Sequence, residues 1–202
     1  MSPRIPLDQV PPSSPGKFAH IVLRSADVAK AREWYKKVLS AWSILEENDM
    51  GAGLTYDSEH HRVLILSLSP AEKEALKGKD VMAIYDERRK LPGLEHFAYT
   101  HTSIANLLST YRRLKKDGIE PVFSVNHGGT LSIYYLDPDG NSVELLIDTL
   151  TMDQANELMH SEAFAENGVG YPFDPEDLCE RYEAGESLSS LLASPYSAAL
   201  AV

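Results

Sequence analysis

The sequence predicts an α+β fold in which two tandem βαβββ modules enclose a cleft and are followed by C-terminal helices. Three observations lead to this prediction. Short segments rich in β-branched and aromatic residues are bounded by turn residues, which is typical of strands. The order of strands and helix is the same in two parts of the chain, so the sequence contains an internal repeat. The segment that begins at Thr149 has helical patterns instead.

The first module is expected over residues 17–68, after a mobile Pro- and Ser-rich arm at residues 1–16. Its first strand is followed by a helix with apolar residues at helical spacing, which Ser25 or Asp27 can cap. Residues 69–93 are more charged and predict a helical connector. The strands of this module are expected at Phe18–Leu23 and near Trp42–Glu46, Gly51–Tyr56 and Arg62–Leu68.

The second module is expected over residues 94–148, with a helix that Ser103 can cap and that ends at Asp117-Gly118. The remaining residues, 149–202, predict a C-terminal helical extension. The strands of the second module are expected at Leu94–Tyr99 and near Glu120–Val125, Leu131–Leu136 and Ser142–Ile147. The helices of the extension are expected around Asp153–Glu166 and Pro175–Ala184, on either side of a loop at Asn167–Phe173 that could cap the cleft or pack outside the sheet.

Simple offsets relate the two modules to each other. A shift of 76 residues places His20 on His96, and a shift of 80 places Leu64 on Glu144. The four extra residues can be accommodated in loops. Two copies of one unit, each with a curved sheet, can pack side by side and enclose a cleft between them.

The segment Thr130–Asp148 predicts two strands joined by a turn at Asp137-Pro138-Asp139-Gly140. In the strand after this turn, Glu144 lies on the opposite face from Val143 and Leu145. A carboxylate within such an apolar strand is costly to bury unless a partner or a metal ion compensates its charge. We therefore expect a partner for Glu144.

Composition excludes several classes of function. A hydrophobic fraction of 43% and a charged fraction of 24% are typical of a soluble globular protein, and no apolar run approaches the ~20 residues that span a bilayer. A formal net charge of −11 argues against binding to nucleic acid or to an anionic membrane. The single cysteine, Cys179, excludes a disulfide within the chain and agrees with a cytoplasmic location. Small molecules are the expected partners.

His20, His96 and Glu144 are the candidate metal ligands. The two histidines occupy equivalent positions in the first strands of the modules, and the carboxylate lies in the last strand of the second module. A lone strand histidine is more often a hydrogen-bonded core residue. Two imidazoles and a carboxylate in one cleft, however, suit Fe(II) and leave coordination positions open, while Zn(II) is also compatible.

Residues 17–148 resemble the vicinal oxygen chelate superfamily, which includes glyoxalases, bleomycin-resistance proteins, thiol transferases acting on fosfomycin, and extradiol dioxygenases. The matching features are the paired βαβββ units, the two strand histidines and the segment from Asp137 to Glu144. The resemblance implies a metal held by His20, His96 and Glu144. Because Leu64 occupies the fourth ligand position of glyoxalase I enzymes, this three-ligand set resembles that of extradiol dioxygenases and of the fosfomycin-type transferases more closely than that of glyoxalase I.

The resemblance also implies two catalytic candidates. Tyr134 stands ten residues before Glu144, the spacing at which extradiol dioxygenases carry a tyrosine that contacts the substrate, although it could simply be a packed aromatic residue. His127 could donate a proton or a hydrogen bond to bound substrate, although a surface-loop histidine is the simpler interpretation. Ring-cleaving members usually carry another histidine about fifteen residues before the second histidine ligand. That place lies near Val81 here, so the substitutes would be His127, His101 or His160.

The leading hypothesis is an Fe(II)-dependent dioxygenase that uses O₂ to cleave a catechol-like or polyphenolic aromatic. A second hypothesis keeps the site with Zn(II), Mn(II) or Ni(II), for a non-oxidative lyase, isomerase or thiol transferase. A third is a metal-free protein that binds a small aromatic molecule. The adjacent His60 and His61 are expected to face solvent, and the sequence leaves open whether the protein is a homodimer.

Overall fold

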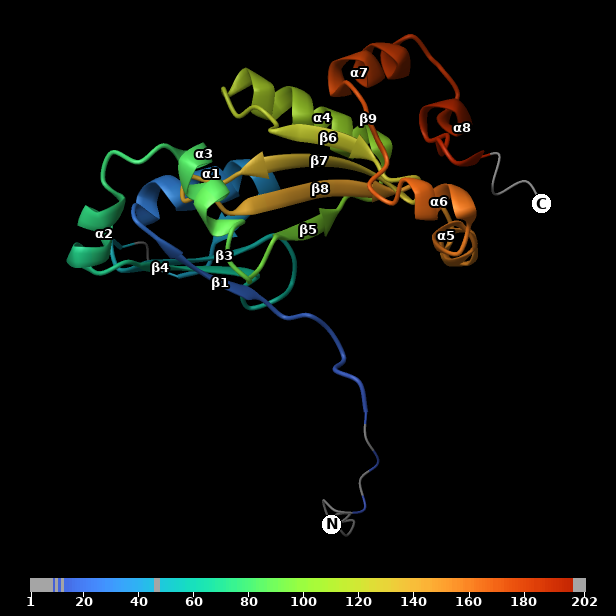
Figure 1. The fold of residues 1–202 in the computed structure, drawn as a ribbon. Helices are drawn as coiled ribbons and strands as arrows, with labels where there is room; N and C mark the ends of the chain where they lie inside the picture. The colour runs from blue at the N-terminus through green and yellow to red at the C-terminus, as the bar shows by residue number, and fades with distance from the viewer. Residues whose placement is uncertain (1–8, 10, 12, 46–47, 198–202) are drawn as a thin grey trace.

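Two β-sheets of similar topology form the body of the computed structural model, which describes residues 9, 11, 13–45 and 48–197 (Figure 1). Most of the expected N-terminal arm at residues 1–16 lies outside the described residues. So does Glu46, at the end of one expected strand. The expectations for these two segments therefore stay predictions.

The first sheet has the strand order β1-β4-β3-β2, with β1 and β4 parallel and the other pairs antiparallel. Asp27 caps its helix by accepting a hydrogen bond from the backbone N–H of Lys30. The elements of this module are β1 (Ile21–Ser25), α1 (Val28–Leu39), β2 (Trp42–Ser43), β3 (Gly51–Thr55) and β4 (Val63–Ser67). The expected helical connector is confirmed as α2 (Pro70–Leu76) and α3 (Val81–Arg88).

The second sheet has the order β5-β8-β7-β6-β9, with β5 and β8 parallel. Ser103 caps its helix by accepting from the backbone N–H of Asn106. The elements of this module are β5 (His96–Thr100), α4 (Ile104–Lys116), β6 (Phe123–Asn126), β7 (Thr130–Leu136) and β8 (Ser142–Asp148).

Strand register confirms the internal repeat. In the first sheet Val22 is opposite Leu64, and in the second Ala98 is opposite Glu144. These pairs are related by the shifts of 76 and 80 residues found in the sequence. The position that is apolar in the first module therefore carries a carboxylate in the second.

Each sheet packs one face against its own helix. The opposite face, which we call the open face, has exposed residues on β1 and β5 but is buried at Ser132, Tyr134 and Glu144 of β7 and β8. Leu54 and Ile65 of the first sheet and Ile133 and Leu145 of the second lie in one hydrophobic cluster with residues of α1 and α4. Because side chains alternate along a strand, neighbours of these residues point to the open faces. On the first sheet, the exposed Val22 and Leu66 lie on this face.

The turn between β7 and β8 joins the two modules. The Tyr35 hydroxyl of α1 donates to Asp137 Oδ2 at 2.8 Å, and the backbone N–H of Ala26 donates to Asp139 Oδ1 at 2.8 Å. Asp137 is 1% exposed. Burial raises the pKa of its carboxyl, although hydrogen bonds from Asn141 and Tyr35 act in the opposite direction. Hydrogen bonds rather than a basic side chain therefore satisfy this buried acid.

The C-terminal extension packs on the second module (Figure 1). Its short strand β9 (Tyr171–Pro172) pairs with β6 at the edge of the sheet, and α7 packs on α4. The helices are α5 (Met152–Met159), α6 (Glu162–Glu166), α7 (Pro175–Glu183) and α8 (Leu188–Leu191). The two expected helical regions are confirmed, whereas β9 and α8 were not predicted.

None of the helices in the described ranges is long and apolar enough to cross a lipid bilayer. The cytoplasmic location expected from the sequence stays a prediction.

Replacing Tyr35 with Phe should lower the free energy of unfolding by about 1–3 kcal/mol, because the buried Asp137 loses a donor. The matched control is Tyr111→Phe at the equivalent position of α4. The Tyr111 hydroxyl donates to Glu176 at 3.3 Å. When that hydroxyl is removed, Glu176 still accepts from the Lys115 ammonium at 2.8 Å. Urea unfolding of both variants should show the larger loss for Tyr35→Phe. Equal losses would contradict the role given to the Asp137 turn.

Candidate active site

Glu144 and His96 meet on the open face of the second sheet. Ala98 is the direct partner of Glu144, and His96 stands two residues earlier on the same face of the neighbouring strand β5. His96 Nε2 lies 3.0 Å from Glu144 Oε2, with side chains that are 37% and 7% exposed. The predicted partner of the mid-strand carboxylate is thus a histidine.

Tyr134 lies opposite Glu144 on β7, and its ring meets that of His96 edge to face, with the centroids 5.4 Å apart. Burial raises the pKa of Tyr134, and the neighbouring Glu144 carboxylate raises it further. The phenol therefore stays protonated and can donate a hydrogen bond. Tyr135 points to the other face and is fully buried in the core, as strand alternation requires.

His127, in the loop between β6 and β7, lies beside Tyr134. Its Nε2 is 3.1 Å from the Tyr134 hydroxyl, and its Nδ1 contacts the backbone carbonyl of Val169 in the C-terminal extension. The ring of Phe123 also stacks on that of Tyr134, with the ring centroids 4.1 Å apart. The four predicted residues His96, Glu144, Tyr134 and His127 thus form one continuous group.

The structure places His20 elsewhere, in a cluster of histidines next to the first sheet. Its ring centroid lies 4.2 Å from that of His61, and His60 Nδ1 lies 2.6 Å from His61 Nδ1. Burial, with smaller contributions from His20 and His60, lowers the pKa of His61. Because His61 Nε2 is buried, the expectation that both histidines of the pair face solvent is wrong for His61.

His96 Nε2 and Glu144 Oε2 are spaced to occupy two adjacent coordination positions of one divalent metal ion. Two ligand atoms about 2.1 Å from one ion, at a right angle to each other, lie about 3.0 Å apart. That is the separation of His96 Nε2 and Glu144 Oε2. Within the part of the chain that the structure describes, no three His, Cys, Asp or Glu side chains form a metal-binding group. The role of His20 as third ligand therefore stays a prediction.

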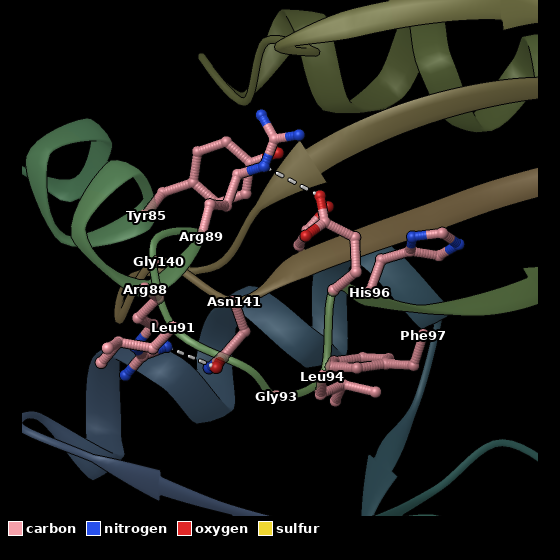
Figure 2. A pocket seen from close by; sticks show the side chains of 12 residues that line it. Tyr85, Arg88, Arg89, Leu91, Gly93, Leu94, His96, Phe97, Gly140 and Asn141 are labelled. Atoms are coloured by element: carbon pink, nitrogen blue, oxygen red, sulfur yellow. Dashed lines mark hydrogen bonds and ion pairs between the residues drawn. The ribbon is translucent and has the colours of Figure 1, made fainter. Parts of the chain in front are cut away.

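A small pocket of about 60 Å³ lies next to His96, between the connector and the turn before β8 (Figure 2). Arg88 donates to Asn141 Oδ1 at 2.6 Å across it. Arg89 pairs with Glu95 at 3.0 Å and lies over the Tyr85 ring. This volume is far below the several hundred Å³ typical of small-molecule sites. This pocket is therefore too small to hold an aromatic substrate beside His96.

Comparison with known proteins identifies the family. The sequence model of the Glyoxalase/Bleomycin resistance protein/Dioxygenase superfamily matches residues 17–145. The chain belongs to this superfamily. A solved glyoxylase/bleomycin resistance protein/dioxygenase domain from Frankia sp. EAN1pec has a similar fold, with a TM-score of 0.51 and 17% identity over 67% of this chain and 93% of that one.

Two relatives within the superfamily are considerably more similar in sequence. Biphenyl-2,3-diol 1,2-dioxygenase 2 from Rhodococcus globerulus is 38% identical over 170 residues, which cover 84% of this chain and 83% of the relative. Biphenyl-2,3-diol 1,2-dioxygenase 3 from the same organism is 37% identical over 176 residues, or 87% and 86% of the two chains. The alignments are longer than the family match, so the resemblance to these dioxygenases extends beyond the two modules.

Two features of the site were not predicted from the sequence. One is the contact of His127 with Val169, and the other is the grouping of His20 with His60 and His61. The two glycines of the Asn167–Phe173 loop were a signal for a close backbone approach there. No sequence pattern indicated which residue that loop would contact.

Proposed function

We propose that this protein is an Fe(II)-dependent extradiol dioxygenase that cleaves the ring of a catechol-like or polyphenolic aromatic with O₂. The observation that carries the proposal is the group on the open face of the second sheet, where His96 and Glu144 lie beside two protic side chains, Tyr134 and His127. The two biphenyl-2,3-diol 1,2-dioxygenases at 37–38% identity support it. Both atoms of O₂ enter the ring-opened product, so the reaction needs no further reductant.

His20, His96 and Glu144 would hold the iron. When bound, Fe(II) supplies a cation that binds the two adjacent oxygens of the diol, lowers their proton affinity and activates O₂. The buried Glu144 carboxylate would offset part of the charge of the ion. His20 must join the pair from the first module, either of the same chain or of a second copy.

Tyr134 and His127 would handle the protons of the diol. The Tyr134 phenol is protonated and donates its one proton toward His127 Nε2, so its oxygen can accept a hydrogen bond from a diol hydroxyl next to His96. The 3.1 Å contact between this phenol and His127 Nε2 offers a path for a proton that the diol releases.

His127 is the best-placed substitute for the histidine that ring-cleaving relatives carry near the position of Val81. His101 follows β5 and is half-buried, and burial lowers its pKa. His160 ends α5, where its Nδ1 contacts the backbone carbonyl of Asn156 at 2.7 Å. Of the three, His127 is the one in contact with Tyr134.

The aromatic surface around Tyr134 suits a flat substrate. Phe123 stacks on Tyr134 with an angle of 16° between the rings, and 42% of Phe123 remains exposed. An aromatic diol can pack against these rings while its oxygens face His96.

Elemental analysis of protein purified without oxygen or chelators should give about one iron per chain. Glu144→Gln, which keeps the shape of the side chain and removes its charge, should lose this iron. Asp148→Asn, at the exposed end of the same strand, is the matched control and should retain it. Zinc, manganese or nickel in place of iron would redirect the search to a non-oxidative lyase, isomerase or transferase. Protein that binds no metal after reconstitution would favour a binding protein.

Iron-loaded protein should consume one O₂ for each biphenyl-2,3-diol or catechol molecule that it cleaves. Tyr134→Phe should lower kcat by a factor of about 10²–10⁴ because it removes the phenol proton, and should keep the iron. An oxygen electrode, with iron measured in the same samples, tests both statements. Iron-loaded protein that consumes no O₂ with any vicinal diol would refute the proposed reaction.

His20→Ala should also lose iron, whereas the neighbouring His60→Ala should keep it. Co-expression of His20→Ala chains with Glu144→Ala chains shows where His20 comes from. If a second copy supplies it, about a quarter of the sites recover iron, since half of the chain pairs are mixed and each mixed pair has one intact site. If each chain closes its own site, the mixture recovers none. Full iron binding by His20→Ala alone would contradict the proposed ligand set.

A further inference from the structure

The two ring nitrogens of His127 have different partners, and these define its tautomer. Nδ1 faces the Val169 carbonyl, which can only accept a hydrogen bond, so Nδ1 carries the proton. In a neutral imidazole Nε2 is then unprotonated and accepts from the Tyr134 hydroxyl, 3.1 Å away. The hydrogen bonds run from Tyr134 through His127 to the C-terminal extension.

The extension also holds the backbone of the loop that carries His127. Strand β9 pairs Tyr171 with Asn126, directly before His127. The Asn126 side chain donates to the Ala193 carbonyl at 3.2 Å, and the Thr149 hydroxyl donates to the Gly128 carbonyl at 2.7 Å. A side chain at Gly128 would collide with Tyr196 and Leu158, so these residues lie directly over the loop.

Gly170 makes the close approach of the two segments possible. It has a φ of +103°, and a Cβ atom there would lie 2.3 Å from the Asn126 carbonyl oxygen. The Asn167 side chain fixes this turn by donating to the Gly170 carbonyl at 2.9 Å and accepting from the Gly170 N–H at 3.1 Å. The Tyr196 hydroxyl in turn donates to the Asn167 carbonyl. Asn167 and Gly170, which lie before and after Val169 in the sequence, therefore hold the Val169 carbonyl in place.

We propose that the C-terminal extension is a functional part of the active site, in which Val169 is a positioning residue that keeps His127 protonated at Nδ1 and open to Tyr134 at Nε2. The catalytic role of His127 rests on the proposed function, whereas the tautomer of its ring rests on the two hydrogen-bond contacts alone. The extension lies beyond residues 17–145, which the superfamily model matches, so the contact between Val169 and His127 lies outside the matched part of the fold.

The test compares Gly170→Ala with Gly185→Ala. Gly185 has a similar φ of +82° and nothing within 4 Å of its Cβ position, so it controls for backbone strain alone. Nitrogen-15 NMR of histidine-labelled protein should show His127 protonated at Nδ1 in the wild type and in Gly185→Ala. Gly170→Ala should give a mixture of tautomers. With iron bound, Gly170→Ala should lower kcat between tenfold and a hundredfold, and should leave KM and iron content unchanged.

A second variant tests the same device without a steric clash. Tyr196→Phe keeps the ring and removes the hydroxyl that holds Asn167, so it should shift the tautomer and kcat in the same direction by a smaller factor. Wild-type tautomer and kcat in both Gly170→Ala and Tyr196→Phe would overturn the inference. If the wild-type protein cleaves no diol, the proposed reaction fails, but the NMR comparison still decides whether Val169 sets the tautomer.

Discussion

The carboxylate of Glu144 is the constraint on which the site depends. It is 5% exposed, between apolar neighbours on its strand, and it lies beside an imidazole and a phenol rather than a basic side chain. Removing a carboxylate from water costs several kcal/mol unless charge and hydrogen bonds compensate it. The equivalent position of the first module is occupied by Leu64, which carries no charge that burial would penalise. The second module therefore retains a costly group that a bound cation would stabilise.

The rest of the second module supports this group from several directions. The parallel register of β5 and β8 brings His96 next to Glu144, and the antiparallel register of β7 places Tyr134 opposite. The buried Asp137 turn, tied to Tyr35 of the first module, fixes the start of β8. The C-terminal extension holds His127 through Val169. Residues far apart in the sequence thus converge on one open sheet face.

The sequence predicted those features of the site that depend on strand alternation and on the internal repeat. Strand alternation placed Glu144 on the opposite face from the buried Val143 and Leu145, and the repeat offsets matched the residues that the registers of the two modules make equivalent. The patterns could not place His20 next to His60 and His61, because that contact depends on how the ends of β1 and β4 meet. They also missed β9, since two residues carry no periodicity. The interaction of Val169 with His127 joins two loops whose meeting depends on the whole second module.

The most direct test of the account is to locate the metal itself. Crystals of protein loaded with Fe(II) under anaerobic conditions can be measured on both sides of the iron absorption edge. An anomalous peak within about 2.3 Å of both His96 Nε2 and Glu144 Oε2, with His20 of either copy as third ligand, is the predicted result. A peak confined to the cluster of His20, His60 and His61 would contradict it. So would iron-loaded crystals with no peak at Glu144.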